Sequence, residues 1–568
     1  MSEPNLDTLI APARPEVVSE EIRRPRPAWI ETLTSADHKR VGKLYIGTAL
    51  SFAVLALVEL LLMRFQLTVD QNTLLEPVTF NRLLSVYGAT TIFLFALPLA
   101  VGIATYIVPL QIGARTTALP RLGLLGWWLF AIGGFALYAT FLFTPPESGV
   151  NPLAPLSDDA FASTRGIDAW VLATGLTLLG LIASSVNLLA TLHNMRAPGM
   201  AWRRMPLFSW SATVSGYLIV VLGGVMLAAL TMLLLDRHYD AVYFEPGEGG
   251  APLFWQHLSW GFFTGAYFVV LLTAFGAIAE ILPVLAGRRP PSHRAQAGAL
   301  VAIGVLGPLA WMQNMLAGPI SVGFLYFAML FGTLICIPIA ILLYNWIATI
   351  WGGALRMRAP LLFALGAIST IVVGLGLELI QTVVPVAWQL ANTAFATAAT
   401  HYALVGGAVF GGFAALYYWF PKMTGRTMLE GPARLSFWLL LIGVHLSFAP
   451  LLLAGLEGEP VDIYKYFPGL DVDTYNLIAT LGTLVLAAGV VTTLVNAIYS
   501  LRNGPAAGHD PWRGRTLEWF ALSPPAESNF DLAPDVRSAE PLVDIRRAIE
   551  RRTGVADPEA AEETQPVA

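Results

Sequence analysis

The chain has 568 residues, of which 56% are hydrophobic and only 12% charged, and its mean hydropathy is +0.64. This composition excludes an ordinary soluble globular protein. The formal net charge is only −5, and no basic cluster or phosphate-binding glycine motif points to nucleic acid, which we exclude as a partner. The sequence therefore predicts a protein whose main surrounding is the lipid bilayer.

The predicted elements begin after a polar, proline-rich stretch over residues 1–40, which we expect to be a cytoplasmic tail. A helix needs about 20 apolar residues to cross a bilayer. Runs of this kind predict twelve transmembrane helices, and hence an all-α, polytopic membrane domain over residues 41–502. The predicted spans are 43–65, 82–110, 122–145, 168–194, 209–235, 255–286, 297–320, 322–352, 360–383, 390–421, 434–456 and 475–501.

The ends of the chain and the loop charges predict the orientation. Loops that follow even-numbered spans carry most of the Lys and Arg residues, which favours a cytoplasmic position for these loops and for both termini. Beyond Arg502 the chain turns polar and ends on ADPEAAEETQPVA. We therefore predict that residues 503–568 form a cytoplasmic, largely disordered tail. We expect a multi-pass protein of the prokaryotic cytoplasmic (inner) membrane.

Several segments carry a resemblance to a known family. They include TSADHKRVGKLY before the first span, NMRAPGM after the fourth, NWIATIWGG in the eighth and THYALVGGAVFGG in the tenth. Together they resemble subunit I of the haem-copper oxidases, the cytochrome c oxidase family. The resemblance implies a twelve-helix bundle that holds two haems and a copper ion and reduces oxygen.

The resemblance also implies six histidine ligands, and only one of them is present. The low-spin haem ligands fall on Tyr87 and His401, the high-spin haem ligand falls on Ala399, and the three copper ligands fall on Thr264, Gln313 and Asn314. A count made without the family agrees, because only His401 and His445 among the eight histidines lie well inside spans. Two histidines are too few for two haems and a copper ion.

These replacements predict a redox-inactive pseudoenzyme that binds no cofactor. We expect it to act as a scaffold or accessory subunit of a respiratory membrane complex, beside subunits like oxidase subunits II and III or within another respiratory complex.

Three alternatives stay open. The first is a working terminal oxidase with unusual ligands. The second is a single-haem electron-transfer subunit, with His401 as candidate axial ligand and Tyr87 opposite. The third is a proton or ion conduit with Glu59 and Glu378 as relays, because carboxylates at membrane depth are costly unless they have a partner or a function.

Overall fold

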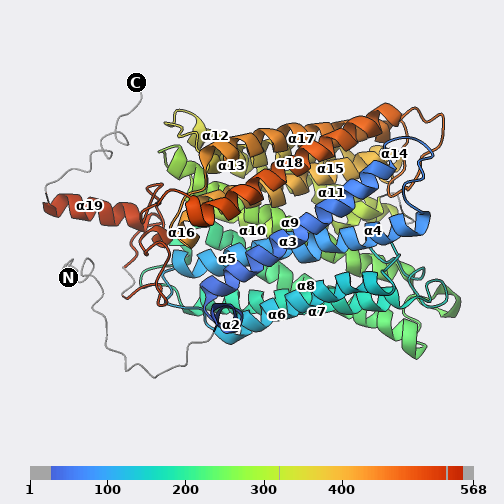
Figure 1. Cartoon of the computed structure of the whole chain (residues 1–568), viewed down its shortest axis with the longest axis horizontal. Coiled ribbons are helices and arrows are strands. Elements are labelled where there is room, and N and C mark those ends of the chain that lie inside the picture. Colours follow the sequence, from blue (N-terminus) through green and yellow to red (C-terminus); the bar gives the residue numbers. More distant parts are fainter. Residues whose placement is uncertain (1–26, 317, 319, 532–534, 554–568) are drawn as a thin grey trace.

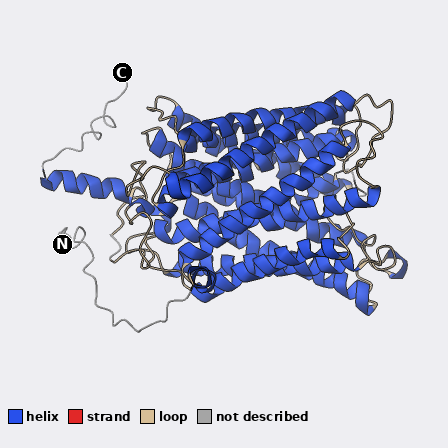
Figure 2. Ribbon diagram, viewed as in Figure 1, coloured by secondary structure: helices blue, strands red, loops and turns tan. Residues whose placement is uncertain are grey.

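The chain folds into a bundle of long helices that run side by side, with the connecting loops gathered at the two ends of the bundle (Figures 1 and 2). The computed structural model describes residues 27–316, 318, 320–531 and 535–553. Within these residues, twelve helical segments are long and apolar enough to cross a membrane. The predicted all-α, twelve-span architecture is confirmed.

The spans differ from the predicted ones mainly at their ends. They are His38–Gln66 (α3), Pro77–Gln111 (α4, η1 and α5), Pro120–Leu142 (α6 and η2), Arg165–Asn194 (α7), Leu207–Tyr239 (α8), Pro252–Leu285 (α9), His293–Met315 (α10 and η5), Val322–Ile350 (α11 and α12), Ala359–Gln381 (α13), Ala394–Thr424 (α15, η6 and α16), Glu430–Leu456 (α17) and Asp473–Asn503 (α18). Ten of the twelve begin earlier than predicted, and three of these ten begin at a proline, namely Pro77, Pro120 and Pro252. Proline is favoured at the first position of a helix because its missing N–H would have no partner there.

Several spans are divided into shorter elements, and other short helices lie between or beyond the spans. The divided spans contain α4 (Pro77–Ala89), η1 (Thr90–Ala96), α5 (Leu97–Gln111), α6 (Pro120–Ala139), η2 (Thr140–Leu142), α10 (His293–Leu309), η5 (Ala310–Met315), α11 (Val322–Leu334), α12 (Cys336–Ile350), α15 (Ala394–Leu404), η6 (Val405–Gly411) and α16 (Gly412–Thr424). The other helices are α2 (Ala28–Thr34), η3 (Trp202–Arg204), η4 (Pro246–Glu248), α14 (Val384–Leu390), η7 (Leu517–Trp519) and α19 (Pro541–Thr553). Within the divided spans, η1 and η6 are π-helical, a form that often marks functional positions within longer helices.

The second, sixth and tenth spans form the centre of the bundle. In their most apolar stretches 89%, 89% and 83% of the residues are buried, against 28% in the eighth span. A helix that is apolar on all sides is stable in the interior, where every side finds a neighbour. Four of the six positions at which the family resemblance places metal ligands lie in these three central spans.

Small residues let neighbouring helices approach closely. A Cβ atom built on Gly126 of α6 would lie 2.7 Å from the carbonyl oxygen of Gly180 on α7, and Gly180 is equally crowded by α6. Inside a membrane, such close backbone contact replaces the hydrophobic effect as the source of helix association. The glycines of these spans therefore serve packing.

A buried polar network ties the first span to the last at one end of the bundle. The Arg64 side chain of α3 donates from Nη2 to Oδ1 of Asn476 on α18 over 2.8 Å. Asn476 Nδ2 in turn donates to both carboxylate oxygens of Glu459, at 3.0 and 3.1 Å. A charged group is stable in such a position only when its hydrogen bonds are made within the protein.

The largest correction to the sequence prediction concerns the C-terminal region. We predicted a largely disordered tail over residues 503–568, but residues 504–531 cover one end of the bundle and bury several side chains there, among them Trp512, Leu517, Trp519 and Phe530. We call residues 504–531 the C-terminal cap. Figure 1 shows this region beside α19, at the same end of the bundle as α2. That this end is cytoplasmic stays a prediction from loop charges.

Two buried polar side chains, the ammonium of Lys422 and the amide of Asn529, anchor the C-terminal cap. Lys422 of α16 is fully buried, and its ammonium donates to the carbonyl oxygens of Ala521, Leu522 and His509, at 2.7, 3.3 and 3.4 Å. Asn529 of the cap contacts His38 Nε2 from α3 and donates to the Ala114 carbonyl at 2.9 Å. The cap is thus bonded to the first and tenth spans and to the loop that follows the second span.

Replacement of the cap anchor tests this arrangement. We expect Lys422→Met to lower the free energy of unfolding by about 3 kcal/mol, because three buried carbonyl groups lose their donor. Thermal unfolding of the purified protein and the rate of proteolysis within residues 504–531 measure the effect. Lys465→Met is the control, since Lys465 lies in a loop and contacts the Tyr464 ring at 5.3 Å. Equal stability of the two variants would contradict the anchoring role.

Glu518 of the cap gives the fold a dependence on pH. Its side chain is fully buried; Oε1 accepts hydrogen bonds from Gln111 at 3.2 Å and from Trp419 at 3.3 Å, while Oε2 has no partner. Burial raises the pKa of this carboxyl above its ordinary value of 4.5. The folded chain therefore keeps a proton on Glu518 at pH values where the unfolded chain has released it.

The sign of the pH effect follows from this difference. The contribution of the Glu518 proton to stability is fully present below pH 4.5 and is lost as the pH rises from 4.5 to the raised pKa of the folded state. We expect Glu518→Gln to weaken the loss of stability over this range, as measured by thermal unfolding at a series of pH values. The exposed carboxylate of the same cap, replaced in Glu527→Gln, should leave the pH profile as it is.

Candidate functional site

Two of the predicted site residues meet in the interior of the bundle. The hydroxyl of Tyr87, on α4, lies 3.4 Å from Nε2 of His401, on α15. Nδ1 of His401 lies 2.7 Å from the Thr397 carbonyl oxygen, which can only accept, so Nδ1 carries the proton. Nε2 is then the acceptor, and Tyr87 donates to it. The structure thus joins the two candidate haem ligands directly to each other.

The surroundings of His401 are aromatic and closely packed. Its ring centroid lies 5.4 Å from that of Phe448 on α17. The next residue, Tyr402, has its hydroxyl 3.1 Å from Nδ1 of His445, which also lies on α17. Helices α15 and α17 are therefore linked by two histidines and their aromatic neighbours.

The residues at the copper positions also bond to each other. Nδ2 of Asn314, on η5, donates to the hydroxyl of Thr264, on α9, over 3.2 Å. The amide of Gln313 occupies the space beside Gly332 of α11. Amide and hydroxyl oxygens are poor copper ligands compared with imidazole. Over the described part of the chain, no three His, Cys, Asp or Glu side chains gather in a way that could hold a metal ion.

Ala399, at the position of the high-spin haem ligand, lies in a tight contact between helices. It is fully buried. A Cβ atom built on Gly374 of α13 would lie 3.0 Å from the Ala399 carbonyl oxygen and 2.5 Å from the backbone nitrogen of Ala403. Helices α13 and α15 approach as closely as their backbones allow, so helix contact fills this part of the interior.

The two candidate relay carboxylates lie on different helices and have different partners. Glu59, on α3, is 5% exposed, its Oε2 has no hydrogen-bond partner, and it interacts with Tyr138 of α6. Glu378, on α13, accepts from the hydroxyl of Tyr267, on α9. The structure does not bring the two carboxylates together. The sequence did not reveal Tyr138 and Tyr267 as partners of these carboxylates. A carboxylate at membrane depth needs a hydrogen-bond donor, and this need is the signal that points to nearby tyrosines.

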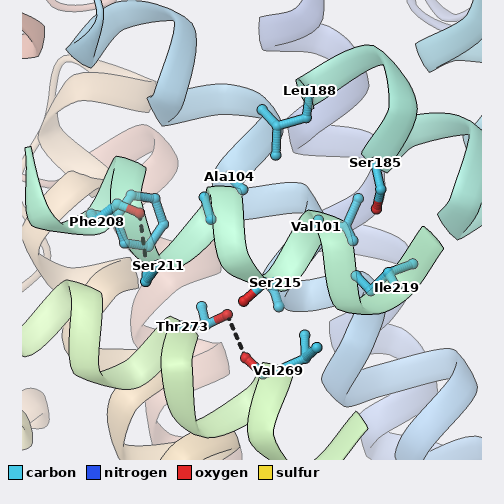
Figure 3. Close-up of a pocket in the computed structure, with 13 residues that line it drawn as sticks. Val101, Ala104, Ser185, Leu188, Phe208, Ser211, Ser215, Ile219, Val269 and Thr273 are labelled. Carbon is cyan, nitrogen blue, oxygen red and sulfur yellow. Dashed lines mark hydrogen bonds between the residues drawn. The ribbon is translucent and has the colours of Figure 1, made fainter. Parts of the chain in front are cut away.

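A small cavity lies between α5, α7, α8 and α9 (Figure 3). Its volume of about 10 Å³ is at the lower limit for a single water molecule. Thr273 donates to the Val269 carbonyl at 2.9 Å, whereas the hydroxyl of Ser215 on the facing helix is buried without a partner. The cavity therefore offers a polar group to a water molecule and has no room for a larger ligand.

The fold and these positions define a polytopic membrane protein built like an oxidase subunit I. The chain belongs to the family described as cytochrome c and quinol oxidase polypeptide I, whose family model matches residues 40–485.

Individual relatives agree with this membership. The chain is 37% identical to cytochrome c oxidase subunit 1 of Bacillus subtilis (strain 168), over 92% of this chain and 84% of that protein. It is 35% identical to cytochrome c oxidase subunit 1 of Thermostichus vulcanus, over 89% of this chain and 92% of that protein. A solved heme-copper terminal oxidase dimer has a similar fold, with a TM-score of 0.71 at 14% identity, over 91% of this chain and 99% of that chain.

These comparisons correct the cofactor prediction. We predicted from the sequence that the chain binds no cofactor, with one haem as the alternative, and this prediction is wrong. The relatives are cytochrome c oxidase subunits, and the protein of similar fold is a heme-copper oxidase, so membership of the family speaks for haem and copper. The comparisons give no sign that the ligands have been lost.

The side chains of this chain fit the two groups unequally. His401 fits a haem, because its Nδ1–H is held by a backbone carbonyl, as in most metal-binding histidines, and its Nε2 is directed away from that carbonyl. A bound haem would supply electron transfer at this position. The hydroxyl of Thr264 and the amide of Asn314 do not fit a copper ion, since neutral hydroxyl and amide groups are poor copper ligands compared with imidazole.

The close contact at Ala399 yields a prediction with an internal control. Gly374→Ala should force α13 and α15 apart and lower the free energy of unfolding by about 2 kcal/mol. Gly376→Ala lies on the same helix with nothing within 4 Å of the added carbon, and should leave stability unchanged or slightly higher. Thermal unfolding in detergent measures both variants. A Gly374→Ala protein as stable as the wild type would show that α13 and α15 leave room for a methyl group at this position.

Proposed function

We propose that this chain is a scaffold or accessory subunit of a respiratory membrane complex and not the centre at which that complex reduces oxygen. One observation carries the proposal: Asn314 and Thr264 hydrogen-bond to each other at positions where the family resemblance puts copper ligands. Oxygen reduction in this family needs a metal next to the high-spin haem, and hydroxyl and amide groups are poor copper ligands. The proposal concerns oxygen reduction and leaves haem binding at His401 to experiment.

The persistence of the family fold supports a structural role. Twelve spans and the family's loop segments are retained, so the folded shape itself serves a purpose. The eighth span is the least buried and presents large side chains outward, namely Tyr326, Leu330, Ile337, Tyr344 and Ile347. The relatives are described as subunit 1 of an oxidase, and we propose partners that resemble subunits II and III. We place the complex in the bacterial cytoplasmic membrane, with both termini of this chain in the cytoplasm.

The second candidate is a working terminal oxidase with unusual ligands. Membership of the family favours it, and so does the orientation of His401, whose Nε2 would bind a metal in place of its 3.4 Å hydrogen bond from Tyr87. In that case the residues around His401 and Thr264 would be indispensable to the reaction.

Oxygen consumption by the purified native complex separates the two candidates. The proposed function predicts that His401→Ala and Asn314→Ala leave the rate of oxygen consumption per complex within about twofold of the wild type, whereas deletion of the chain prevents assembly. A working oxidase would lose more than about tenfold in rate on either substitution, since ligands and their neighbours have effects of this size. Glu457→Gln, an exposed carboxylate at the end of α17, is the control for general damage.

A further inference from the structure

Glu378 is a carboxylate near one end of a membrane-spanning helix, and its environment is more specific than a helix packing role requires. It lies three positions before the last residue of α13, between more exposed residues that face outward, such as Val373 and Leu379. An ionised carboxylate within the hydrocarbon region is costly, so such a residue faces a partner within the protein or carries a proton. The side chains around Glu378 decide between these two possibilities.

The donors that surround Glu378 are neutral. The hydroxyl of Tyr267 lies 2.9 Å from both Oε1 and Oε2, and the side chain of Thr400 on α15 is a further hydrogen-bonding partner. Tyr267 itself is only 9% exposed. Two hydroxyl groups can donate to the carboxylate form and accept from the acid form, so the same geometry serves both states of the carboxyl group.

The titratable groups on the helices packed against α13 are engaged elsewhere. On α15, His401 bonds to Thr397 and Tyr87, and Tyr402 bonds to His445 of α17. Lys422, the cation of α16, is held by carbonyl groups of the C-terminal cap. The segments η6 and α14, VGGAVFG and VPVAWQL, contain no titratable residue. On α17, Glu430 accepts from the Ala359 N–H and Arg434 donates to the Met357 carbonyl, both at the opposite end of α13, and Glu280 of α9 accepts from the Phe208 N–H. Among the residues that the structure describes, Glu378 thus faces hydroxyl groups and no cation that would hold it ionised.

A polar stripe on α9 leads from this cluster towards one end of the bundle. Thr264 lies three positions before Tyr267 and His257 seven positions before Thr264, spacings that put all three on one side of the helix. Thr264 and His257 each have a polar neighbour on the seventh span: Asn314 donates to Thr264 at 3.2 Å, and Trp311 Nε1 donates to His257 Nδ1 at 3.2 Å. Asn314 is exposed, so the stripe reaches the surface about one helical turn from Tyr267.

We propose that Glu378, Tyr267 and Thr400 form a proton-binding site, which exchanges its proton with the aqueous phase along the Thr264 and Asn314 side of α9. The site opens at the end of the bundle that carries α14 (Figure 1). Its ligand is a proton and not a metal ion, because a hard cation takes about six oxygen ligands and Glu378, Tyr267 and Thr400 supply only four. This inference does not rest on the proposed function, since a scaffold and an oxidase could both contain such a site.

Carbodiimide labelling tests the site on the intact complex. Dicyclohexylcarbodiimide is an apolar reagent that adds to protonated carboxyl groups, and peptide mass mapping locates the adduct. We expect an adduct on Glu378 whose yield falls roughly tenfold for each pH unit above its midpoint, as for a single titrating group. Glu378→Gln should lose this adduct, and Tyr267→Phe should shift the pH range in which it forms. Glu457, which is exposed at the end of α17, should give no adduct with this apolar reagent in the same samples.

Hydrogen–deuterium exchange of the carboxyl infrared band provides the second measurement and needs no variant of Glu378. We expect a band from a protonated carboxyl group that shifts in heavy water, and slower exchange in Asn314→Leu than in the wild type or in Glu457→Gln. The proposal is overturned by a lack of labelling at Glu378, by labelling that is independent of pH, or by protection with sodium ions at constant pH. Exchange at an unchanged rate in Asn314→Leu would overturn the proposed route.

Discussion

A polar side chain inside this bundle is stabilised by a hydrogen-bond partner within the protein, because the surrounding lipid offers none. This constraint explains the interior better than any single residue does. Tyr87 bonds to His401, Asn314 to Thr264, and Tyr267 to Glu378, and each bond joins two different spans. The same polar groups that give the interior its chemistry therefore also fix the relative positions of the helices.

Close packing completes what the polar bonds begin. At Gly374 the backbones of α13 and α15 touch, and Ala399 lies in this contact. At the other central positions the π-helical segment η6 presents glycines to its neighbours, and Gly411 approaches Ala274 of α9. Interiors are packed as densely as organic crystals, so a change of side chain at one ligand position is felt by the neighbouring helices. The small side chains at these positions and the close approach of the helices therefore depend on each other.

The twelve spans could be predicted because a lipid-spanning helix has a strong and simple signal, about 20 consecutive apolar residues. The exact ends could not, since they depend on proline at the first helical position, as at Pro77 and Pro252. The C-terminal cap was missed because its polar composition resembles that of a disordered tail. Its order depends on Lys422 and Asn529, whose partners lie nearly 100 and nearly 500 positions away in the sequence. No local pattern encodes such contacts.

The candidate site shows a different limit. The sequence identified Tyr87, His401, Thr264 and Asn314 as positions that matter, and the structure brings them together in two bonded pairs. It also led to the prediction of no cofactor, which the family comparisons contradict. A count of histidines measures which donors one chain offers, whereas binding also depends on backbone carbonyls that orient a ring, such as that of Thr397 beside His401. The orientation of His401 is therefore the feature in which the family's chemistry and this chain's own residues agree, while the Thr264 and Asn314 pair is the feature in which they differ.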